Sequence, residues 1–295
     1  MSKVSTYHHF IPKFYLNNFT DANNQFYIYL VREKRFKKNG KLFSPSSHFF
    51  IKNGNTIKQF GKKEDFLEKE HYSNLDSEVA LIFEKINSNE GISKCGLTDF
   101  EIVKLNYFFT HLFWRNPKND ELIRQLIQAK SIKAFGFKLI DENRQEIFDE
   151  NIDNIIKNHP DIYKLLKYTF PLNTFTNNFI TNMDYTLLPF PKSNLPSLLG
   201  DNPIIFNNND KIDTYLEEII IPITKSIIFI RSNNLDVQFH SSTKVLIDML
   251  QLKQANEYVC CTNKEYILQL DSVFENEFKS IDRLRSLIFF DLKKK

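Results

Sequence analysis

The order of the sequence patterns predicts an α+β fold. Strand-like segments occur near both ends of the chain, in about residues 1–62 and 184–295, and helical patterns fill about residues 63–183. Separate runs of strands and helices are typical of α+β domains. We therefore expect a single domain over residues 1–295, with one mixed sheet built from the N-terminal and C-terminal strands and packed against the central helical region.

The composition is that of a globular protein. The 295 residues are 42% hydrophobic and 25% charged, which excludes wholesale disorder. The net charge of +3 is too small to indicate a nucleic-acid-binding protein by itself. Three cysteines without a Cys-x-x-Cys pair form no disulfide framework and favour a reducing compartment. No apolar run is long enough to span a membrane, so we expect a cytoplasmic protein without a membrane partner.

The N-terminal region begins with a short helix at residues 14–19. Residues 25–31 alternate in polarity and are rich in β-formers, which predicts a strand, and a second strand near 48–51 is expected to pair with it. The turn between these strands carries the densest basic cluster, which we interpret as a solvent-exposed hairpin tip: Arg32, Lys34, Arg35, Lys37, Lys38 and Lys41.

The middle region is helical. Apolar residues recur at three-to-four spacing from Phe66 to Ile86, which predicts an amphipathic helix. Thr98 and Glu101 form a capping-box pattern that opens a second helix. This helix continues to Pro117 and is apolar around most of its circumference, so it should lie centrally. Further helices are expected at about 119–138 and 160–182.

The C-terminal region returns to strands. Strands are expected at 185–189, 204–206, 218–223 and 226–230 and, after a helix at 242–257, at 258–261; a closing helix is expected over 271–286. Several of these strands are continuous β-branched runs, which indicate a sheet that is mostly buried.

Two polar residues in the first half of the chain are candidates for chemistry. His9 precedes the first helix, and an imidazole exchanges protons readily near neutral pH. Glu78 adjoins the apolar stripe of its helix, so its carboxylate is expected to point inward and to need a partner. The alternatives are that His9 packs under the first helix and that Glu78 reaches water.

Two further candidates lie later in the chain. Arg115 ends the most apolar helix, where a guanidinium needs a carboxylate or a bound anion. Asp201 lies in a Gly-Asp-Asn-Pro turn before a buried strand, where functional carboxylates often occur. The alternatives are an internal ion pair of Arg115 with Glu78 or Asp201, and an ordinary turn at Asp201.

Several segments together resemble a known family. Residues 8–19 are similar to a Gln-His-Tyr-Val-Pro-x-x-Tyr-Leu-x-x-Phe pattern, with His8 in place of Gln. Arg115-Asn116-Pro117 matches an Arg-x-Pro element, and residues 200–203 match Ser/Thr-Asp-x-Pro with Gly in place of the hydroxyl residue. Residues 222–224 resemble a Pro-Leu-Ser element, and residues 248–255 an Asn-rich helix in which Asp248 replaces Asn. In this order, the segments resemble the bacterial domain-of-unknown-function family 4238.

The resemblance implies a cytosolic single-chain protein with no established activity. Members of the family sometimes lie near mobile or defence genes, which suggests a toxin or anti-phage defence role. Glu78 corresponds to a glutamate that the family has in an early helix.

The first functional hypothesis is a hydrolase of nuclease or phosphodiesterase type acting on RNA or nucleotides. His9 would be the general acid or base, and Arg115 would stabilise the charge on phosphate. Glu78 and Asp201 would orient His9, activate water or hold a divalent metal. Three neighbouring residues are expected to contact the ligand: Tyr15, Asn202 and His8.

Two other hypotheses stay open. In the second, the protein is a non-catalytic regulatory module that binds an anion or nucleotide, with Arg115 as the anchor. In the third, the four polar residues form an internal network that braces the helices against the sheet. Whether His9, Arg115, Glu78 and Asp201 share one solvent-reachable hollow decides between these hypotheses.

Overall fold

The α+β fold is confirmed. The computed structural model describes residues 6–59, 62–89, 93–136, 138, 140–147, 149–177, 184–189, 196, 198–208, 217–232 and 241–291. The strands are β1 (Tyr7–His9), β2 (Phe26–Leu30), β3 (Arg35–Phe36), β4 (Leu42–Phe43), β5 (Phe50–Lys52), β6 (Ile57–Gln59), β7 (Lys62–Glu64), β8 (Asp184–Pro189), β9 (Leu198–Gly200), β10 (Ile205–Phe206), β11 (Ile219–Pro222), β12 (Ile227–Ser232) and β13 (Tyr258–Cys261). The α-helices are α1 (Lys13–Asn17), α2 (Ser73–Ser88), α3 (Asp99–Arg115), α4 (Asp120–Ala129), α5 (Glu150–Lys157), α6 (Ile162–Asn177), α7 (Ser241–Gln254), α8 (Lys264–Val273) and α9 (Ile281–Asp291).

The strands form two main sheets. One has the order β3-β2-β13-β9, with β4 also on β2, and the other has the order β10-β11-β12-β8. The pairing of β2 with β13 confirms that N-terminal and C-terminal strands share a sheet. All strand pairs in the described ranges are antiparallel, and the second sheet is separate, whereas the sequence predicted one mixed sheet. Strands β11 and β12 pair in an antiparallel manner because a short turn connects them, whereas parallel neighbours need a long crossover connection.

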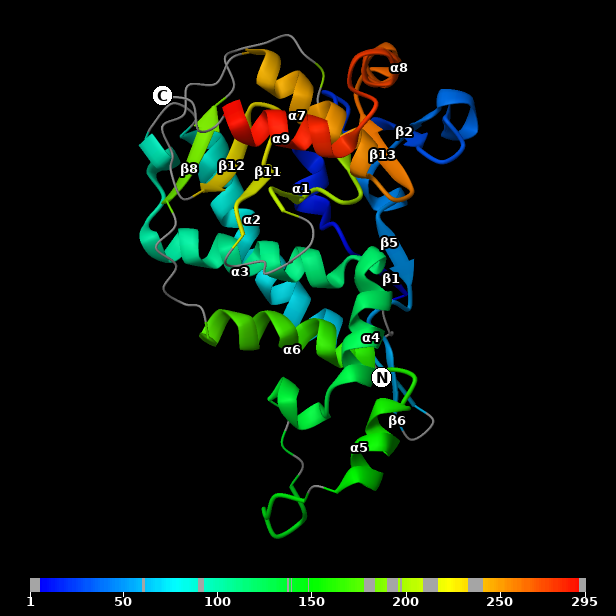
Figure 1. Ribbon diagram of the computed structural model, residues 1–295, viewed down its shortest axis with the longest axis vertical. Helices are drawn as coiled ribbons and strands as arrows, with labels where there is room; N and C mark the ends of the chain where they lie inside the picture. Colours follow the sequence, from blue (N-terminus) through cyan, green and yellow to red (C-terminus); the bar gives the residue numbers. More distant parts are fainter. Residues whose placement is uncertain are drawn as a thin grey trace.

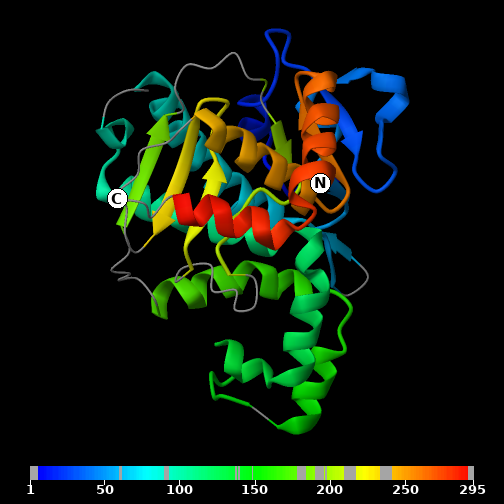
Figure 2. The same cartoon turned by 45° about the horizontal axis from the view of Figure 1, so that its top comes forward.

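Both faces of the second sheet are covered by helices. Ile221 and Phe229 face the cluster that contains α2 and α3, and the rings of Phe229 and Phe109 lie 4.9 Å apart. Ile220 and Ile228 face the opposite cluster, which contains α7 and α9. Figures 1 and 2 show α7 and α9 lying across one face of these strands. Because both faces of this sheet are buried, the side chains on both faces are apolar, and the strands appear in the sequence as continuous apolar runs.

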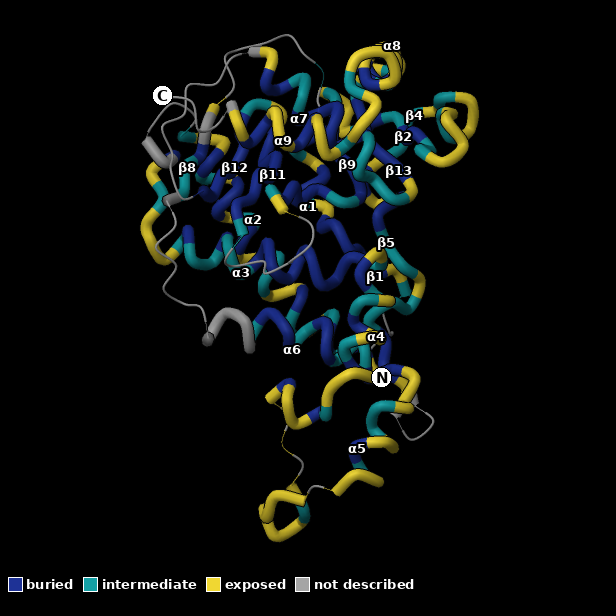
Figure 3. The backbone as a smooth tube through the Cα atoms, in the orientation of Figure 1, coloured by how far each residue is buried: buried dark blue, intermediate teal, exposed yellow. Residues whose placement is uncertain are grey.

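Helix α3 lies at the centre of the fold, as its sequence predicts. The Thr98 hydroxyl accepts a hydrogen bond from the Glu101 N–H, and the Glu101 carboxylate accepts one from the Thr98 N–H at 2.7 Å, so the capping box is confirmed. Much of α3 is buried, as the dark tube in Figure 3 shows. The predicted helix 66–86 is also present, as a π-helical turn, η3 (Leu67–Tyr72), followed by α2.

Other expectations are corrected. The predicted strand at 48–51 is β5, and it pairs with β1 rather than β2, because β3, β4 and β13 occupy the edges of β2. The closing helix predicted over 271–286 is interrupted: α8 ends at Val273, a π-helical turn, η7 (Phe274–Phe278), follows, and α9 begins only after Lys279, which has a left-handed conformation (φ 58°). The last residues of the helix predicted at 160–182 lie outside the described ranges.

Helices α4 and α5 extend away from the sheets, toward the bottom of Figure 1. Much of α5 is exposed, as Figure 3 shows in yellow. Within the described part of the chain, no helix combines the length and the apolarity that crossing a bilayer requires.

Candidate functional site

Arg115 is buried at the end of α3 and pairs with a carboxylate. Its Nη1 and Nη2 atoms donate to the two carboxylate oxygens of Asp76 at 2.9 and 3.1 Å, and Nη2 also donates to the His9 carbonyl oxygen. The guanidinium lies 4.9 Å from the centre of the Tyr72 ring. The expectation of an internal partner is therefore confirmed, but the partner is Asp76 rather than Glu78 or Asp201.

Glu78 does not point inward, so this expectation is wrong. Its side chain is 57% exposed and forms an ion pair with Lys104 at 2.9 Å. Successive helical residues are rotated by about 100°, so Glu78 lies roughly 200° around α2 from Asp76. The carboxylate that faces Arg115 is therefore the one two residues earlier.

Asp201 braces a turn and is sealed from solvent. Its carboxylate accepts hydrogen bonds from the backbone N–H groups of Asn256, Glu257 and Tyr258 at 2.7, 2.7 and 3.1 Å. Its own carbonyl oxygen accepts from the Asn116 side-chain amide at 2.7 Å. Burial raises the pKa of Asp201, and the three backbone hydrogen bonds oppose that rise. The alternative of a turn-forming role is the one that this geometry supports.

Two of the three expected ligand contacts are also buried. Tyr15 is fully buried and donates its hydroxyl hydrogen to the Pro222 carbonyl oxygen. His8 is 2% exposed, and its Nδ1 accepts a hydrogen bond from the Asn55 N–H at 2.8 Å. Asn202 is half-buried and lines a small hollow beside Gln254. Only Asn202 of the three faces a space that a ligand could enter.

His9 lines a hollow of about 450 Å³, which also exposes Lys13, Glu68 and Asp76. Burial, followed by the positive charge of Lys13, lowers the pKa of His9 to about 4. The imidazole is therefore uncharged at pH 7. A neutral ring in this position accepts a hydrogen bond more readily than it delivers a proton.

The four residues predicted to be catalytic do not share one hollow. His9 and Arg115 are in contact through the His9 carbonyl oxygen. Asp201 is connected to this pair only through Asn116, the residue after Arg115. Glu78 lines a different hollow, together with His111. The arrangement thus combines one imidazole in the wall of a hollow with a buried bracing network, formed by Arg115, Asp76, Asn116 and Asp201.

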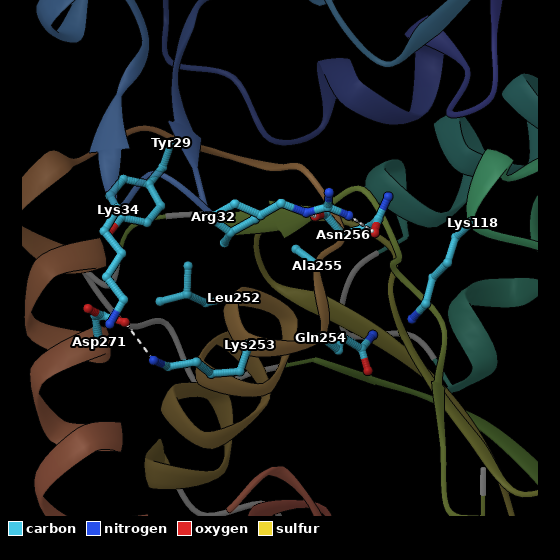
Figure 4. Close-up of a pocket in the computed structure, with 11 residues that line it drawn as sticks. Tyr29, Arg32, Lys34, Lys118, Leu252, Lys253, Gln254, Ala255, Asn256 and Asp271 are labelled. Carbon is cyan, nitrogen blue, oxygen red and sulfur yellow. Dashed lines mark hydrogen bonds and ion pairs between the residues drawn. The ribbon is translucent and has the colours of Figure 1, made fainter. Parts of the chain in front are cut away.

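A second hollow, which we call the basic cleft, is lined by cationic side chains. Its volume is about 380 Å³, and Arg32, Lys34, Lys118 and Lys253 line it together with Asn256, Gln254 and Asp271. Figure 4 shows Arg32 extending to Asn256, with Lys118 approaching from a separate part of the chain. Against four cations, the lining contains the single carboxylate of Asp271, so the cleft attracts anions.

The cations at the Lys34 end of the basic cleft are held by neighbouring groups. Arg32 donates to the Asn256 carbonyl oxygen at 3.1 Å and to its side-chain oxygen at 2.9 Å. Lys253 contacts Asp271 at 2.6 Å and Glu275 at 2.8 Å. These contacts fix Arg32 and Lys253 in place and partly neutralise the charge of Lys253.

Lys118 differs from the other cations of the cleft. Its ammonium has no ion pair or hydrogen bond to any residue that the structure describes. Although the residue is exposed at the rim, desolvation and then the Arg285 guanidinium lower its pKa, and Asp201 opposes this. Lys118 also lines an adjoining hollow of about 230 Å³ with Asn202 and Arg285. Lys118 is thus a cation of the cleft without an ion-pair partner among the described residues.

The bracing network fixes the walls of the basic cleft. Asn116 ties the segment that carries Lys118 to Asp201, and Asp201 holds the turn that carries Asn256. Gln251 of α7 donates to the Pro203 carbonyl oxygen at 2.7 Å and accepts from the Gly200 N–H. A Cβ at Gly200 would lie 2.7 Å from the Gln251 carbonyl oxygen, so only glycine fits at this contact.

The sequence reasoning missed the residues that line this cleft. Arg32 and Lys34 belong to the basic cluster that was interpreted as a solvent-exposed hairpin tip, and Lys118 directly follows the Arg-Asn-Pro element. That adjacency is a signal that could have identified Lys118. Lys253 and Asn256 carry no such signal, because only the fold brings them beside Lys118.

A metal site does not emerge from the same residues. Across the described ranges, no group of three or more histidine, cysteine, aspartate or glutamate side chains could hold a metal ion. The carboxylates of Asp76 and Asp201 are engaged by Arg115 and by backbone N–H groups. The alternative in which Glu78 and Asp201 hold a divalent metal thus has no located ligand set among the described residues.

Comparison with known proteins yields one match. The model of a family described as "Protein of unknown function (DUF4238)" matches residues 7–272, which confirms the resemblance found in the sequence. No curated protein and no solved structure matches the chain.

Proposed function

We propose that this chain, which belongs to the DUF4238 family of proteins of unknown function, is a module that binds the phosphate group of a nucleotide or of RNA in the basic cleft. The observation that carries the proposal is Lys118, a cation that lines the cleft and has no ion pair with the described residues. A bound phosphate would supply that partner, and Arg32 and Lys34 would add charge from the opposite wall.

The chemistry of the lining favours binding over turnover. The cleft offers cations and amides, no imidazole, and one carboxylate, Asp271, that is already paired with Lys253. Such a set stabilises negative charge but does not transfer protons. The hydrolase hypothesis, of nuclease or phosphodiesterase type, therefore stays a prediction without a located acid or base in this cleft, as does a role in anti-phage defence.

The space suits a ligand of nucleotide size. The basic cleft and its neighbour, of about 380 and 230 Å³, both include Lys118 and Gln254 in their linings. Small-molecule sites commonly enclose about 300–1,000 Å³. Asn202 in the second hollow offers an amide that can bond a base or sugar. A cytoplasmic location, which the free buried cysteines favour, would give access to such ligands.

The test is a titration of the full chain with inorganic phosphate, adenosine monophosphate, adenosine triphosphate and a short single-stranded RNA. We expect binding by at least one phosphate-bearing ligand, weakening with added salt. Lys118→Gln should weaken it roughly ten- to a hundredfold, since a charge-assisted hydrogen bond contributes about 1.5–3 kcal/mol. The matched control is Lys130→Gln, because Lys130 is exposed and lies outside the cleft.

Two outcomes would count against the proposal. Equal affinities of Lys118→Gln and Lys130→Gln would remove the cleft from binding. Conversion of the nucleotide or RNA into products during the titration, followed by chromatography, would favour the hydrolase hypothesis instead.

A further inference from the structure

The hollow beside His9 is a second potential site and shares no lining residue with the basic cleft. At about 450 Å³ it is the larger of the two, and its walls come from β1, α1, η3 and α2. The polar side chains that the argument uses are His9, Lys13, Glu68, Lys69 and Asp76.

His9 lines this hollow and carries an acceptor without a partner. The residue is 8% exposed, and its Nε2 has no hydrogen-bond partner in the structure. The other side of the ring is hydrogen-bonded to the Pro45 backbone, which leaves the lone pair on Nε2 available. A buried polar atom without a partner destabilises the protein, so a ligand that donates a hydrogen bond here removes that cost.

Two carboxylates provide further acceptors. The Asp76 side chain is 22% exposed and lines the hollow, and its oxygens keep lone pairs beyond those that Arg115 uses. Glu68 accepts from the Asn55 side-chain amide at 2.8 Å and also lines the hollow. The inner wall therefore offers mainly acceptors.

The rim of the hollow provides donors. Lys13 is exposed, and its ammonium has no ion pair with the residues that the structure describes. Lys69 also lines the hollow and pairs with Asp65 at 3.0 Å. Within the lining, the two cations Lys13 and Lys69 balance the two carboxylates of Glu68 and Asp76, so the lining carries no net charge.

This balance selects the class of ligand. Because attraction and repulsion by these four charges offset each other, neither a cation nor an anion is favoured by the lining as a whole, and a ligand without net charge fits best. A hydroxyl group both donates and accepts hydrogen bonds, which matches acceptors on the inner wall and donors on the rim. The exposed Tyr7 ring and Phe14 add apolar surface for the carbon face of such a ligand.

We propose that the hollow at His9 binds a small molecule with neighbouring hydroxyl groups, either a free sugar or the ribose of a nucleoside. One hydroxyl donates to His9 Nε2, a second donates to the Asp76 or Glu68 carboxylate, and Lys13 donates to a hydroxyl oxygen. This site is independent of phosphate binding in the basic cleft.

The first test observes the acceptor itself. Full-length protein labelled with ¹⁵N on its histidine rings is titrated with D-ribose, D-glucose, D-galactose, N-acetylglucosamine and adenosine, each up to its solubility. Binding should shift the Nε2 resonance of His9 and leave that of His48 unchanged. His48 is the internal control, because its Nε2 is also buried without a partner and it lines none of the hollows named above.

The second test fills the hollow. Ala80 of α2 lines it, so Ala80→Leu should abolish ligand binding, whereas Ala129→Leu at the exposed end of α4 should not affect it. Phosphate binding by the Ala80→Leu protein should stay at the wild-type level, which separates this proposal from that of the basic cleft and shows that the variant folds.

The arms of the titration distinguish the sources of the hydroxyl groups. A response to adenosine and ribose alone assigns a nucleoside, and a response to the hexoses assigns a free sugar. No shift of the His9 resonance with any of the five compounds overturns the proposal. Binding that survives Ala80→Leu overturns it as well, because the ligand then occupies another place.

Discussion

The basic cleft and the bracing network around Arg115 both contain charged side chains, but they differ in the burial and in the partners of those side chains. In the network, Arg115 and Asp201 are 3% exposed, and backbone or side-chain partners engage their charged groups. In the cleft, Lys118 and Lys34 are exposed, and Lys118 has no partner among the described residues. Arg115 and Asp201, which the sequence indicates as catalytic candidates, therefore stabilise the fold. Lys118 and Lys34, which were not candidates, line the space where a ligand can bind.

The two regions depend on each other through Asn116. It follows Arg115, donates to the Asp201 carbonyl oxygen, and precedes the turn that carries Lys118. Because the network fixes this turn, the cations of the cleft need little reorganisation to meet an anion. Substitutions in the network should therefore change stability first, and substitutions in the cleft should change only binding.

The largest effect is expected for Arg115→Met. This change leaves the Asp76 carboxylate without its cation and the His9 carbonyl oxygen without its donor, and it should lower the free energy of unfolding by about 3–5 kcal/mol. Urea denaturation measures this loss. Adding Asp76→Leu should restore part of the stability, since the unpaired charge is then removed. A double variant that is no more stable than Arg115→Met would show that the ion pair is not the cause.

A somewhat smaller effect is expected from acid. Burial, followed by the charges of Lys37 and Lys38, lowers the pKa of His48 from 6.5 to about 4. Between pH 4 and pH 6.5, His48 is therefore protonated in the unfolded chain but not in the folded chain. Stability is full above pH 6.5 and declines as the pH falls toward 4, by up to about 3 kcal/mol for this ring.

His48→Phe isolates this contribution. Phe keeps the edge contacts with Phe43 and Tyr258, whose ring centres lie 4.6 and 5.9 Å from that of His48. The difference in unfolding free energy between wild type and His48→Phe should shift in favour of the variant as the pH falls from 6.5 to 4. Burial raises the pKa of Asp76 and of Asp201, so their contribution to stability changes with pH in the direction opposite to that of His48. This contribution is the same in both proteins and cancels in the difference. A difference that stays constant with pH would contradict the assignment.

Asp201→Asn should cost about 2 kcal/mol of stability. The amide keeps one acceptor but turns an NH₂ group toward the N–H groups of residues 256–258, and the relief of a buried charge offsets part of the loss. The same change should weaken phosphate binding in the basic cleft, because it loosens the turn that carries Asn256. Thermal unfolding and a phosphate titration measure the two effects. Wild-type values in both would show that Asp201 does not brace this turn.

The smallest effect is expected for Glu78→Gln. The exposed ion pair with Lys104 should contribute less than about 0.5 kcal/mol. Both phosphate binding and urea stability should stay near wild-type values. A large loss of phosphate binding would show that Glu78 is a functional residue, although it does not line the basic cleft.

Much of the fold could be predicted from local sequence patterns. The capping box at Thr98, the apolar periodicity of α2 and α3, and the strand at 258–261 appear in the structure near their expected bounds. Helix α5 and strand β9 were not predicted, because β9 is a three-residue strand and α5 has few buried residues. Their formation depends on tertiary contacts that a local pattern does not contain.

The candidate site could be predicted only in part. The sequence identified His9 as a residue at a pocket and Arg115 as a buried cation that needs a carboxylate, since both follow from the chemistry of the side chain and its neighbours. It could not choose Asp76 over Glu78, because both adjoin the apolar stripe of α2 and the choice depends on how that helix is rotated against α3.

The amino-acid sequence by itself determined the family, the α+β class and the central position of α3, because these depend on motif order and on periodicities that span a few turns of chain. Only the tertiary structure decided which charges are neutralised and which stay open to a ligand. Arg32, Lys118 and Lys253 are far apart in the chain and meet only after the sheet forms, and Coulomb interactions depend on distance in space rather than on separation in sequence.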